Sequence, residues 1–443
     1  MIGSLAMCFV VDPILASVAI AILVILLLGL HLRGFETSWG SISQALIFHQ
    51  VRKYLLLLDS RKDHIKFWRP QVLLMVSNPR SSCQLIDFAN DLKKSGLYIL
   101  GHVKVGSLDS ELTDPIVEDY PKWLGLVDHL KVKAFVELTL ARSIREGMHH
   151  LIRVSGLGGM KPNTICFGFY DQMAPGDSLA ERQQRTTTRR RLLKFNNDAT
   201  ENPGLVDNFT SLRDPSAERS FSGGEYIQMI YDTLKLKKNV CLCRHFHRLD
   251  KDAILSSRRK MHIDVWPINF FQPETANHFD NTCLFVLQLA CILHMVRGWK
   301  QKTKLRVFTC IEEQREERER KEKKLAEFLK LLRIRGEIEV VGWEHILRSL
   351  QQSLGEPNIG MAALASGVHE PGEPLPDEYM KNINGLIRDN CRETAVVFLY
   401  LPKAPSGEGN KQETYLRKLE LLTDNLPPTV LVHGLQPVTC TSL

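Results

Sequence analysis

Two cysteines and two histidines alternate with other residues at Cys241, Cys243, His245 and His247. On a single strand all four side chains would project from one face, and thiolates and imidazoles are the ligands of structural zinc. Structural zinc sites usually leave about two to four residues between ligands, whereas neighbours on one strand face crowd a tetrahedron. The first half of the motif also lies in an apolar run. The pattern therefore favours a buried strand, and no metal site is predicted.

A second group of residues invites a phosphate-binding interpretation. Ser77, Asn78 and Arg80 follow the apolar run 72–77 and precede a helical pattern over 82–94. Ligands of open α/β sheets bind at the carboxyl ends of strands, where helix N-termini offer N–H groups and a positive dipole. An ordinary capped turn is the alternative. The glycine-rich run 156–163 lacks the spacing of a phosphate loop, and we expect a turn leading into a strand over 164–170.

Catalytic groups are not indicated by any local pattern. No Ser/His/Asp, Cys/His or paired-carboxylate arrangement has supporting sequence around it, and the adjacent His149 and His150 point in different directions on a helix. We therefore predict that the chain is not an enzyme. The formal charge of +7 over 443 residues is modest, and no nucleic-acid-binding motif is present, so no nucleic-acid partner is expected. The ten cysteines are scattered, which is typical of reduced thiols in a cytosolic domain.

The first apolar segment is long enough to cross a bilayer. No residue from Pro13 to Leu32 carries a full charge, and Ile14–Leu30 is nearly all aliphatic. A helix of this length reaches roughly 30 Å, the thickness of the hydrocarbon layer. Basic residues such as Arg52 and Lys53 follow the segment, which predicts a cytosolic C-terminal side. Plasma membrane and lysosomal or other internal membranes both remain open, with Ile14–Leu32 as the contact with the lipid bilayer.

Beyond this segment, helical and strand patterns alternate. An amphipathic helix is expected over 39–63, and then short apolar runs alternate with helices, which is typical of a mostly parallel sheet covered by helices. The stretch 175–222 is polar and lacks periodicity, and we expect a flexible insertion. The predicted fold is α/β: one N-terminal transmembrane helix followed by a cytosolic domain of two α/β halves with mostly parallel sheets. The expected segments are 1–35 (transmembrane helix), 36–67 (connecting helix), 68–174 (first half), 175–222 (insertion) and 223–443 (second half).

Five segments, in order along almost the whole chain, resemble the cytosolic C-terminal domain of cation–chloride cotransporters. They are WRPQVLLMVSNP (Trp68–Pro79), LIDFANDLKKSGLYILGHVKVG (Leu85–Gly106), GLGGMKPNTICFGF (Gly156–Phe169), VRGWKQKTKLRVFTC (Val296–Cys310) and LELLTDNLPPTVLVHGLQPVT (Leu419–Thr439). The chain departs from the family at His433-Gly434, where members usually carry Arg-Gly, and in the insertion 175–222. These departures place it in a divergent branch of the family.

The resemblance implies a full-length protein with about a dozen membrane helices, of which this chain holds the last. The chain is then either a shortened isoform or a fragment, and the ion-binding residues of the family lie outside it. Some family members hold an adenine nucleotide in this domain, which by analogy assigns phosphate contacts to Ser77, Asn78 and Arg80. No cofactor is required by the main prediction.

The resulting hypothesis is a membrane-tethered regulatory and dimerisation domain of a cation–chloride cotransporter-like protein. The full-length protein would carry out chloride-coupled cation transport or modulate related cotransporters. The expected protein partners are a second copy, or related cotransporters in a heteromer. The alternative from another class is a nucleotide-responsive sensor or small-molecule enzyme on a doubly wound α/β scaffold. The transported solute is not identified by these residues.

Overall fold

The computed structural model describes residues 12–32, 41–58, 68–110, 112–171, 175–184, 205–213, 219–273, 279–311, 315–353, 375–407 and 409–438. The chain divides into two compact units, Met1–Asp59 and Ser60–Leu443. Both hydrophobic core clusters and every strand named below belong to the second unit. That unit therefore carries its own core and is expected to fold without the first.

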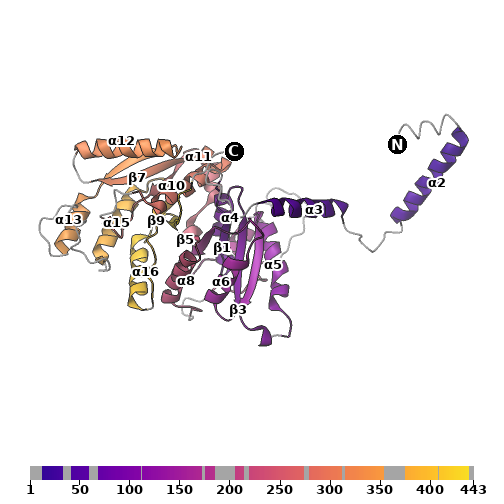
Figure 1. The fold of residues 1–443 in the computed structure, drawn as a ribbon, viewed down its shortest axis with the longest axis horizontal. Coiled ribbons are helices and arrows are strands. Elements are labelled where there is room, and N and C mark those ends of the chain that lie inside the picture. The colour runs from indigo at the N-terminus through magenta and orange to yellow at the C-terminus, as the bar shows by residue number, and fades with distance from the viewer. Residues whose placement is uncertain are drawn as a thin grey trace. The chain divides into compact units, whose positions relative to one another are not determined.

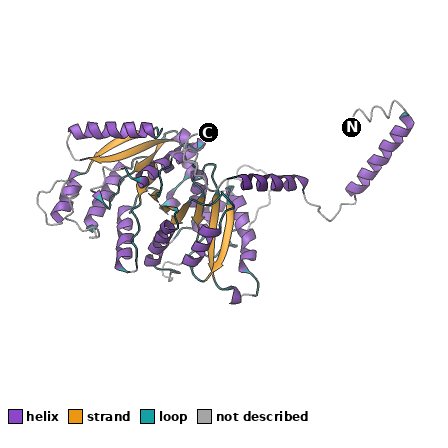
Figure 2. Cartoon of the chain, in the orientation of Figure 1, coloured by secondary structure: helices purple, strands orange, loops and turns teal. Residues whose placement is uncertain are grey.

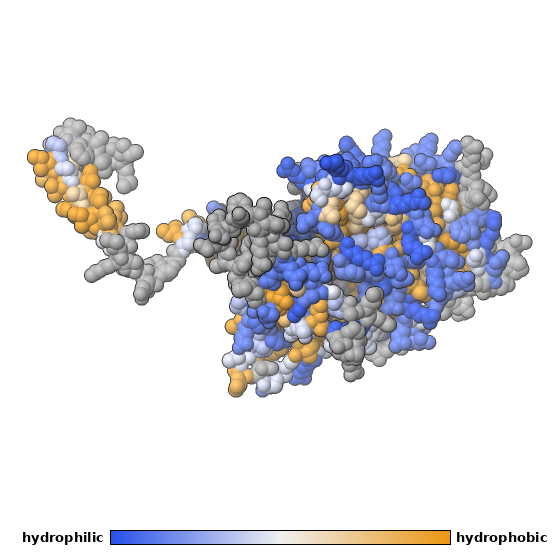
Figure 3. Space-filling model, turned by 180° about the vertical axis from the view of Figure 1, so that it is seen from behind, coloured by the Kyte–Doolittle hydropathy of each residue, from blue (hydrophilic) through white to orange (hydrophobic). Residues whose placement is uncertain are grey.

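The first unit contains helix α2, Pro13–Leu32. The carboxylate of Asp12 accepts hydrogen bonds from the backbone N–H groups of Ile14 (3.0 Å) and Leu15 (3.2 Å), which caps the helix. The described part of α2 is hydrophobic along most of its length (Figure 3). Judged on the residues that the structure describes, no helix reaches the length and apolarity of a bilayer crossing, and the span predicted for Ile14–Leu32 is unconfirmed.

Helix α3, Ile42–Leu57, forms within the range predicted for a connecting helix. None of its residues is buried. At 3.6 residues per turn, Ile42 and Leu46 project from one side of the helix, while Ile47 and Val51 project from the opposite side. The expected single apolar face is therefore not seen, because apolar side chains leave the axis in nearly all directions. The flanking residues 33–40 and 59–67 lie outside the described part of the chain.

The second unit is built on one ten-stranded sheet with the order β3-β2-β1-β4-β5-β10-β9-β6-β7-β8 (Figures 1 and 2). The strands are β1 Val72–Met75, β2 Tyr98–Val105, β3 Phe135–Ala141, β4 Thr164–Gly168, β5 Asn239–Arg244, β6 Met261–Trp266, β7 Thr303–Ile311, β8 Glu337–Gly342, β9 Thr394–Tyr400 and β10 Thr429–His433. Neighbouring strands are parallel except β5 and β10, which pair antiparallel. The prediction of a mostly parallel α/β sheet is confirmed.

The two halves of this sheet repeat one topology. Strands β1–β5 lie in the order 3-2-1-4-5, and β6–β10 reproduce that order with β10 in the place of β5. The halves meet along the antiparallel β5–β10 pair, so they share one sheet instead of forming two. The predicted boundary at 222/223 is wrong, because β5 pairs in parallel with β4 (Cys166 beside Cys241) and completes the first half at Arg244.

Helices cover both faces of the sheet, and each face has its own core cluster. One face is covered by α4 Cys83–Leu92, α5 Pro115–Leu130, α9 Lys251–Ser256, α10 Asn281–His294, α11 Arg297–Lys302 and α12 Arg315–Leu331. The other is covered by α6 Ile144–Val154, α8 Gly223–Lys235, α13 Glu344–Ser353, α15 Asp377–Asn390 and α16 Asn410–Leu422. Successive strand residues alternate between the clusters, as Leu73 and Leu74 do in β1.

Residues 175–184 and 205–213 of the insertion pack into the first core cluster, while Phe221 packs against the second. Leu179 is 0% exposed and Leu205 is 2% exposed, and the ring of Phe209 lies 5.7 Å from that of Trp123. The expectation of a flexible insertion is wrong for these residues, because a few spaced apolar side chains anchor an otherwise polar stretch. The Thr186–Thr188 and Arg189–Arg191 runs lie outside the described residues.

Candidate functional site

The residues predicted to contact phosphate lie together at the carboxyl end of β1. Ser77 is exposed, while Asn78 and Arg80 are half-buried. The side-chain oxygen of Asn78 accepts a hydrogen bond from the backbone N–H of Arg80 (2.9 Å), which caps a short 3-10 turn, η1 Pro79–Ser81. Its amide nitrogen donates to the carbonyl oxygen of Thr210 (3.0 Å). Asn78 therefore joins this turn to the insertion.

Arg80 is paired with an acid from the same insertion. Its Nε donates to Oδ2 of Asp177 (2.9 Å), and its Nη2 forms a second contact with that oxygen. The hydroxyl of Ser178 donates to the carbonyl oxygen of Arg80 (2.8 Å). Burial alone would raise the pKa of Asp177, but the hydrogen bond and charge of Arg80 lower this pKa below its ordinary value. A bound phosphate would have to replace Asp177, and the phosphate role of Ser77, Asn78 and Arg80 stays a prediction.

Replacing Asp177 by Asn is expected to lower the free energy of unfolding of residues 60–443 by about 1 kcal/mol, because the pair is only partly buried. The pKa of Asp177 is lower in the folded protein than in the unfolded chain. Its contribution is therefore fully present above about pH 4, the pKa of the unfolded chain, and is lost as pH falls below that value through the lower pKa of the folded protein. Urea unfolding at several pH values measures this. A difference between wild type and Asp177→Asn that persists undiminished at pH 3 would contradict the assignment.

The Cys/His motif is split by the end of a strand. Cys241 and Cys243 are buried in β5 and belong to the core. The strand ends at Arg244, and His245 adopts a left-handed backbone (φ 61°) from which its Nε2 lies 3.0 Å from the carbonyl oxygen of Thr423. His247 is exposed in the following turn, η3 Phe246–Arg248. The prediction of a buried strand is confirmed for the two cysteines.

The glycine-rich run forms the predicted turn before β4. Leu157 and Met160 exchange backbone hydrogen bonds of 3.0 Å across it. Gly156 has a φ of +87°, and a Cβ there would lie 2.2 Å from the carbonyl oxygen of Met160. This turn requires glycine for both reasons.

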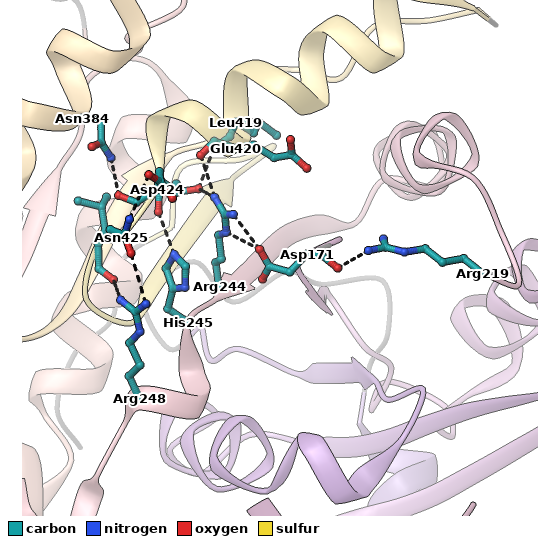
Figure 4. A network of polar contacts seen from close by, with 12 residues as sticks. Asp171, Arg219, Arg244, His245, Arg248, Asn384, Leu419, Glu420, Asp424 and Asn425 are labelled. Carbon is teal, nitrogen blue, oxygen red and sulfur yellow. Dashed lines mark hydrogen bonds and ion pairs between the residues drawn. The ribbon is translucent and has the colours of Figure 1, made fainter. Parts of the chain in front are cut away.

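A polar network joins the two halves of the sheet to each other (Figure 4). Arg244, at the end of β5, is 9% exposed. Its Nε donates to Asp171 (2.8 Å), while its Nη1 donates to the hydroxyl of Thr423 (2.7 Å) and the carbonyl oxygen of Glu420 (2.9 Å). Its guanidinium also lies 4.4 Å from the ring centroid of Phe169. We call Arg244 with these partners the inter-half latch.

The latch sits at the C-terminal end of α16, where free carbonyl groups favour a cation. Burial raises the pKa of Glu420 and lowers the pKa of His245. On the other side, Asn384 of α15 donates to the carbonyl oxygens of Leu422 and Asp424 (both 2.9 Å). The network satisfies backbone groups and offers no nucleophile and base in contact. It can transmit a displacement of one half to the other.

Sequence reasoning missed this latch. Arg244 is 73 positions from Asp171 and 176 and 179 positions from Glu420 and Thr423, and no motif links them. One local signal was present: Arg244 directly follows the apolar run Val240–Cys243, so its guanidinium needs either solvent or buried acceptors.

Comparison with known proteins gives the family. Residues 82–177 match the sequence model of solute carrier family 12. Over 449 residues, the chain is 46% identical to solute carrier family 12 member 9 of Xenopus laevis. The alignment covers 100% of this chain and 48% of the Xenopus protein. The chain belongs to solute carrier family 12. The resemblance found in the sequence is thereby confirmed, including its placement with the divergent branch called the cation–chloride cotransporter-interacting protein.

Other relatives of this solute carrier family 12 chain agree. It is 40% identical over 466 residues to human solute carrier family 12 member 9, covering 99% of the chain and 49% of the relative. It is 33% identical over 346 residues to vacuolar cation-chloride cotransporter 1 of Saccharomyces cerevisiae. That alignment covers 75% of this chain and 30% of the yeast protein. These relatives are transporter-family proteins, which favours a non-enzymatic role. The chain spans about half the length of the member 9 relatives.

Among solved structures, the cytoplasmic domain of a prokaryotic cation chloride cotransporter is similar with a TM-score of 0.39 and 11% identity. The alignment covers 83% of this chain and 96% of that one.

Proposed function

We propose that this chain is a membrane-tethered regulatory and dimerisation domain of a cation–chloride cotransporter-like protein. The observation that carries the proposal is similarity over the whole chain to family members twice its length, combined with an α/β unit in which no catalytic arrangement is found among the described residues. In this proposal the full-length protein carries out chloride-coupled cation transport or modulates related cotransporters. Movement of the α/β unit relative to the membrane part would change that activity.

The tether in this proposal is α2. The support comes from residues 13–32, which form one helix without a fully charged side chain, and from the basic residues Arg52 and Lys53 on α3. These favour insertion with the α/β unit on the cytosolic side. Plasma membrane and lysosomal or other internal membranes are both compatible with this arrangement.

The coupling element in this proposal is α3. Ile42, Phe48 and Leu56 are 81%, 71% and 79% exposed in the described structure. A helix that exposes this much apolar surface is favoured to bind partner surfaces. A contact with two alternative arrangements would convert movement of the α/β unit into a change in the membrane part.

Light scattering on residues 60–443 tests the dimerisation part. We expect the mass of a homodimer at micromolar concentrations. A monomer over that whole range would remove the homodimer, and co-precipitation with a full-length family member then tests the heteromer.

The nucleotide-responsive alternative rests on the position of Asn78 and Arg80 at the carboxyl end of β1, beside the point where strand order reverses between β1 and β4. Calorimetry with ATP on residues 60–443 separates the nucleotide-responsive alternative from the regulatory domain proposed above. Heat of binding that disappears in Arg80→Ala supports the sensor, and its absence in the wild type removes it.

A further inference from the structure

The amino edge of the first half gathers the segments that precede five neighbouring strands. Register places Phe135 beside Ile99, Val72 beside both Tyr98 and Thr164, and Thr164 beside Asn239. Because neighbouring strands lie about 4.8 Å apart, the segments before these positions form one continuous border. The chain that follows α2 and α3 enters the α/β unit at this border, through residues 68–71.

The entering segment is hydrogen-bonded to the glycine turn. The side-chain oxygen of Asn163 accepts from the backbone N–H of Gln71 (2.9 Å), and its amide nitrogen donates to the carbonyl oxygen of Arg69 (3.0 Å). Lys238 closes the other side by donating to the carbonyl oxygen of Pro162 (2.6 Å). The turn therefore has a fixed position next to the entry point of the chain.

Exposed lysines line this border. Lys131, Lys133, Lys161, Lys235 and Lys237 are exposed, and none forms an ion pair within the described part of the chain. We call these five lysines the basic edge. Burial lowers the pKa of Lys238, and the charge of Lys161 lowers it further. Burial and the charge of Lys133 lower the pKa of Lys93, against the opposing effect of Asp91.

Apolar side chains project from the same border. Val154 is 77% exposed and Leu157 is 67% exposed, with Met160 beside Leu157 in the turn. Phe135, at the start of β3, is 64% exposed. Exposed apolar residues flanked by lysines match an anionic lipid surface, since the apolar groups enter the headgroup layer and the ammonium groups contact phosphate.

The opposite edge provides a comparison. The amino ends of β6 and β7 also carry exposed lysines, including Lys260 and Lys300. Because β10 runs antiparallel to β5, these residues lie on the other edge of the sheet. That edge also carries exposed apolar side chains, namely Leu331 in the second half and Val105, Leu108 and Leu112 at and beyond the carboxyl end of β2. The chain from α3 does not enter at that edge.

We propose that the basic edge, with Leu157 of the glycine turn at its centre, docks the α/β unit on an anionic lipid bilayer. The inference rests on the proposed function in one respect: tethering by the preceding chain would hold this edge close to the bilayer. The docking is reversible and electrostatic, and it turns the amino edge of the first half toward the membrane.

Flotation of residues 60–443 with phosphatidylcholine vesicles, with and without phosphatidylserine, tests this inference. We expect binding only with phosphatidylserine, weakened by salt. Each basic residue near an anionic surface contributes roughly a fivefold gain in binding. Lys161→Glu/Lys237→Glu is therefore expected to weaken binding at least ~25-fold. The matched control, Lys260→Glu/Lys300→Glu, changes the net charge equally and is expected to weaken it less than ~5-fold. Leu157→Ser is expected to lower affinity roughly tenfold.

Equal losses in the two charge-reversal variants, or no flotation of the wild type with phosphatidylserine, would overturn the inference. Binding to an RNA oligonucleotide without flotation would overturn it as well. Urea unfolding confirms that each variant is folded. The fragment lacks α2, so the result does not depend on the membrane span. A full chain that stays in membranes while the fragment ignores the vesicles refutes the docking alone.

Discussion

Replacing Arg244 by methionine is expected to lower the free energy of unfolding of residues 60–443 by about 3 kcal/mol. The substitution keeps an apolar stem of similar length and removes the guanidinium. It leaves the carboxylate of Asp171, the hydroxyl of Thr423 and the carbonyl of Glu420 without their charged donor. Buried groups that lose a charged partner cost more than the original bond contributed. Urea unfolding followed by circular dichroism measures the change.

Arg248→Met is the matched control for this prediction. Arg248 lies four residues further on, is exposed, and reaches Asn425 and the carbonyl of Leu426 only at 3.5 Å. We expect a loss below about 1 kcal/mol, since exposed polar contacts contribute little. Hydrogen exchange adds a second readout: Arg244→Met should speed exchange in α16 and at the β5–β10 pair. Equal small losses in both variants would show that the latch does not hold the halves together.

The second large effect concerns a buried ion pair inside the second half. Asp264 of β6 is 0% exposed and accepts hydrogen bonds from Arg306 of β7 at 2.8 and 2.9 Å, and a further one from the hydroxyl of Thr394. Burial raises the pKa of Asp264 despite these partners. Asp264→Ala removes the partner of a guanidinium that is itself nearly buried. The free energy of unfolding is expected to fall by about 3–5 kcal/mol.

A neighbouring pair that joins β7 to β8 supplies the control. Glu337 and Lys304 contact at 2.7 Å, but both side chains are about half exposed. Glu337→Ala is therefore expected to lower the free energy of unfolding by less than about 1 kcal/mol. The double variant Asp264→Leu/Arg306→Met should recover most of the loss, because an apolar pair has no unmatched charge to bury. Failure of the double variant to recover stability would contradict this explanation.

Much of the sheet could be predicted from sequence because parallel strands covered on both faces are continuous apolar runs. The runs at β1 and β4 are of this kind, and both were predicted. Helix α5 was missed, since Pro121 lies inside it and Val117, Tyr120 and Leu124 on its outer side are exposed. The partnership of β5 with β4 was also missed, because a long polar insertion separates them and pairing between strands leaves no local mark.

The candidate sites were less predictable than the strands, because contacts between distant segments leave no mark in the local sequence. Asn78 and Arg80 were placed correctly at a strand end, but their partners Thr210 and Asp177 lie 132 and 97 positions away. Periodicity reports which face of an element is buried, and it says nothing about which distant acid meets a given arginine. Arg244 illustrates the limit, because its position after an apolar run is visible in the sequence whereas its burial and its acceptors follow from the fold.

Alkaline carbonate extraction of membranes from cells that express the full chain tests the central claim, that α2 holds this domain in a bilayer. Comparison is made with Leu23→Arg/Leu26→Arg in the middle of α2 and Leu56→Arg on α3. One arginine at the centre of a span opposes insertion by about 2.5–3.5 kcal/mol. The wild type and Leu56→Arg are predicted to stay in the membrane pellet, and the α2 variant is predicted to be released. Release of the wild-type chain by carbonate would contradict the account.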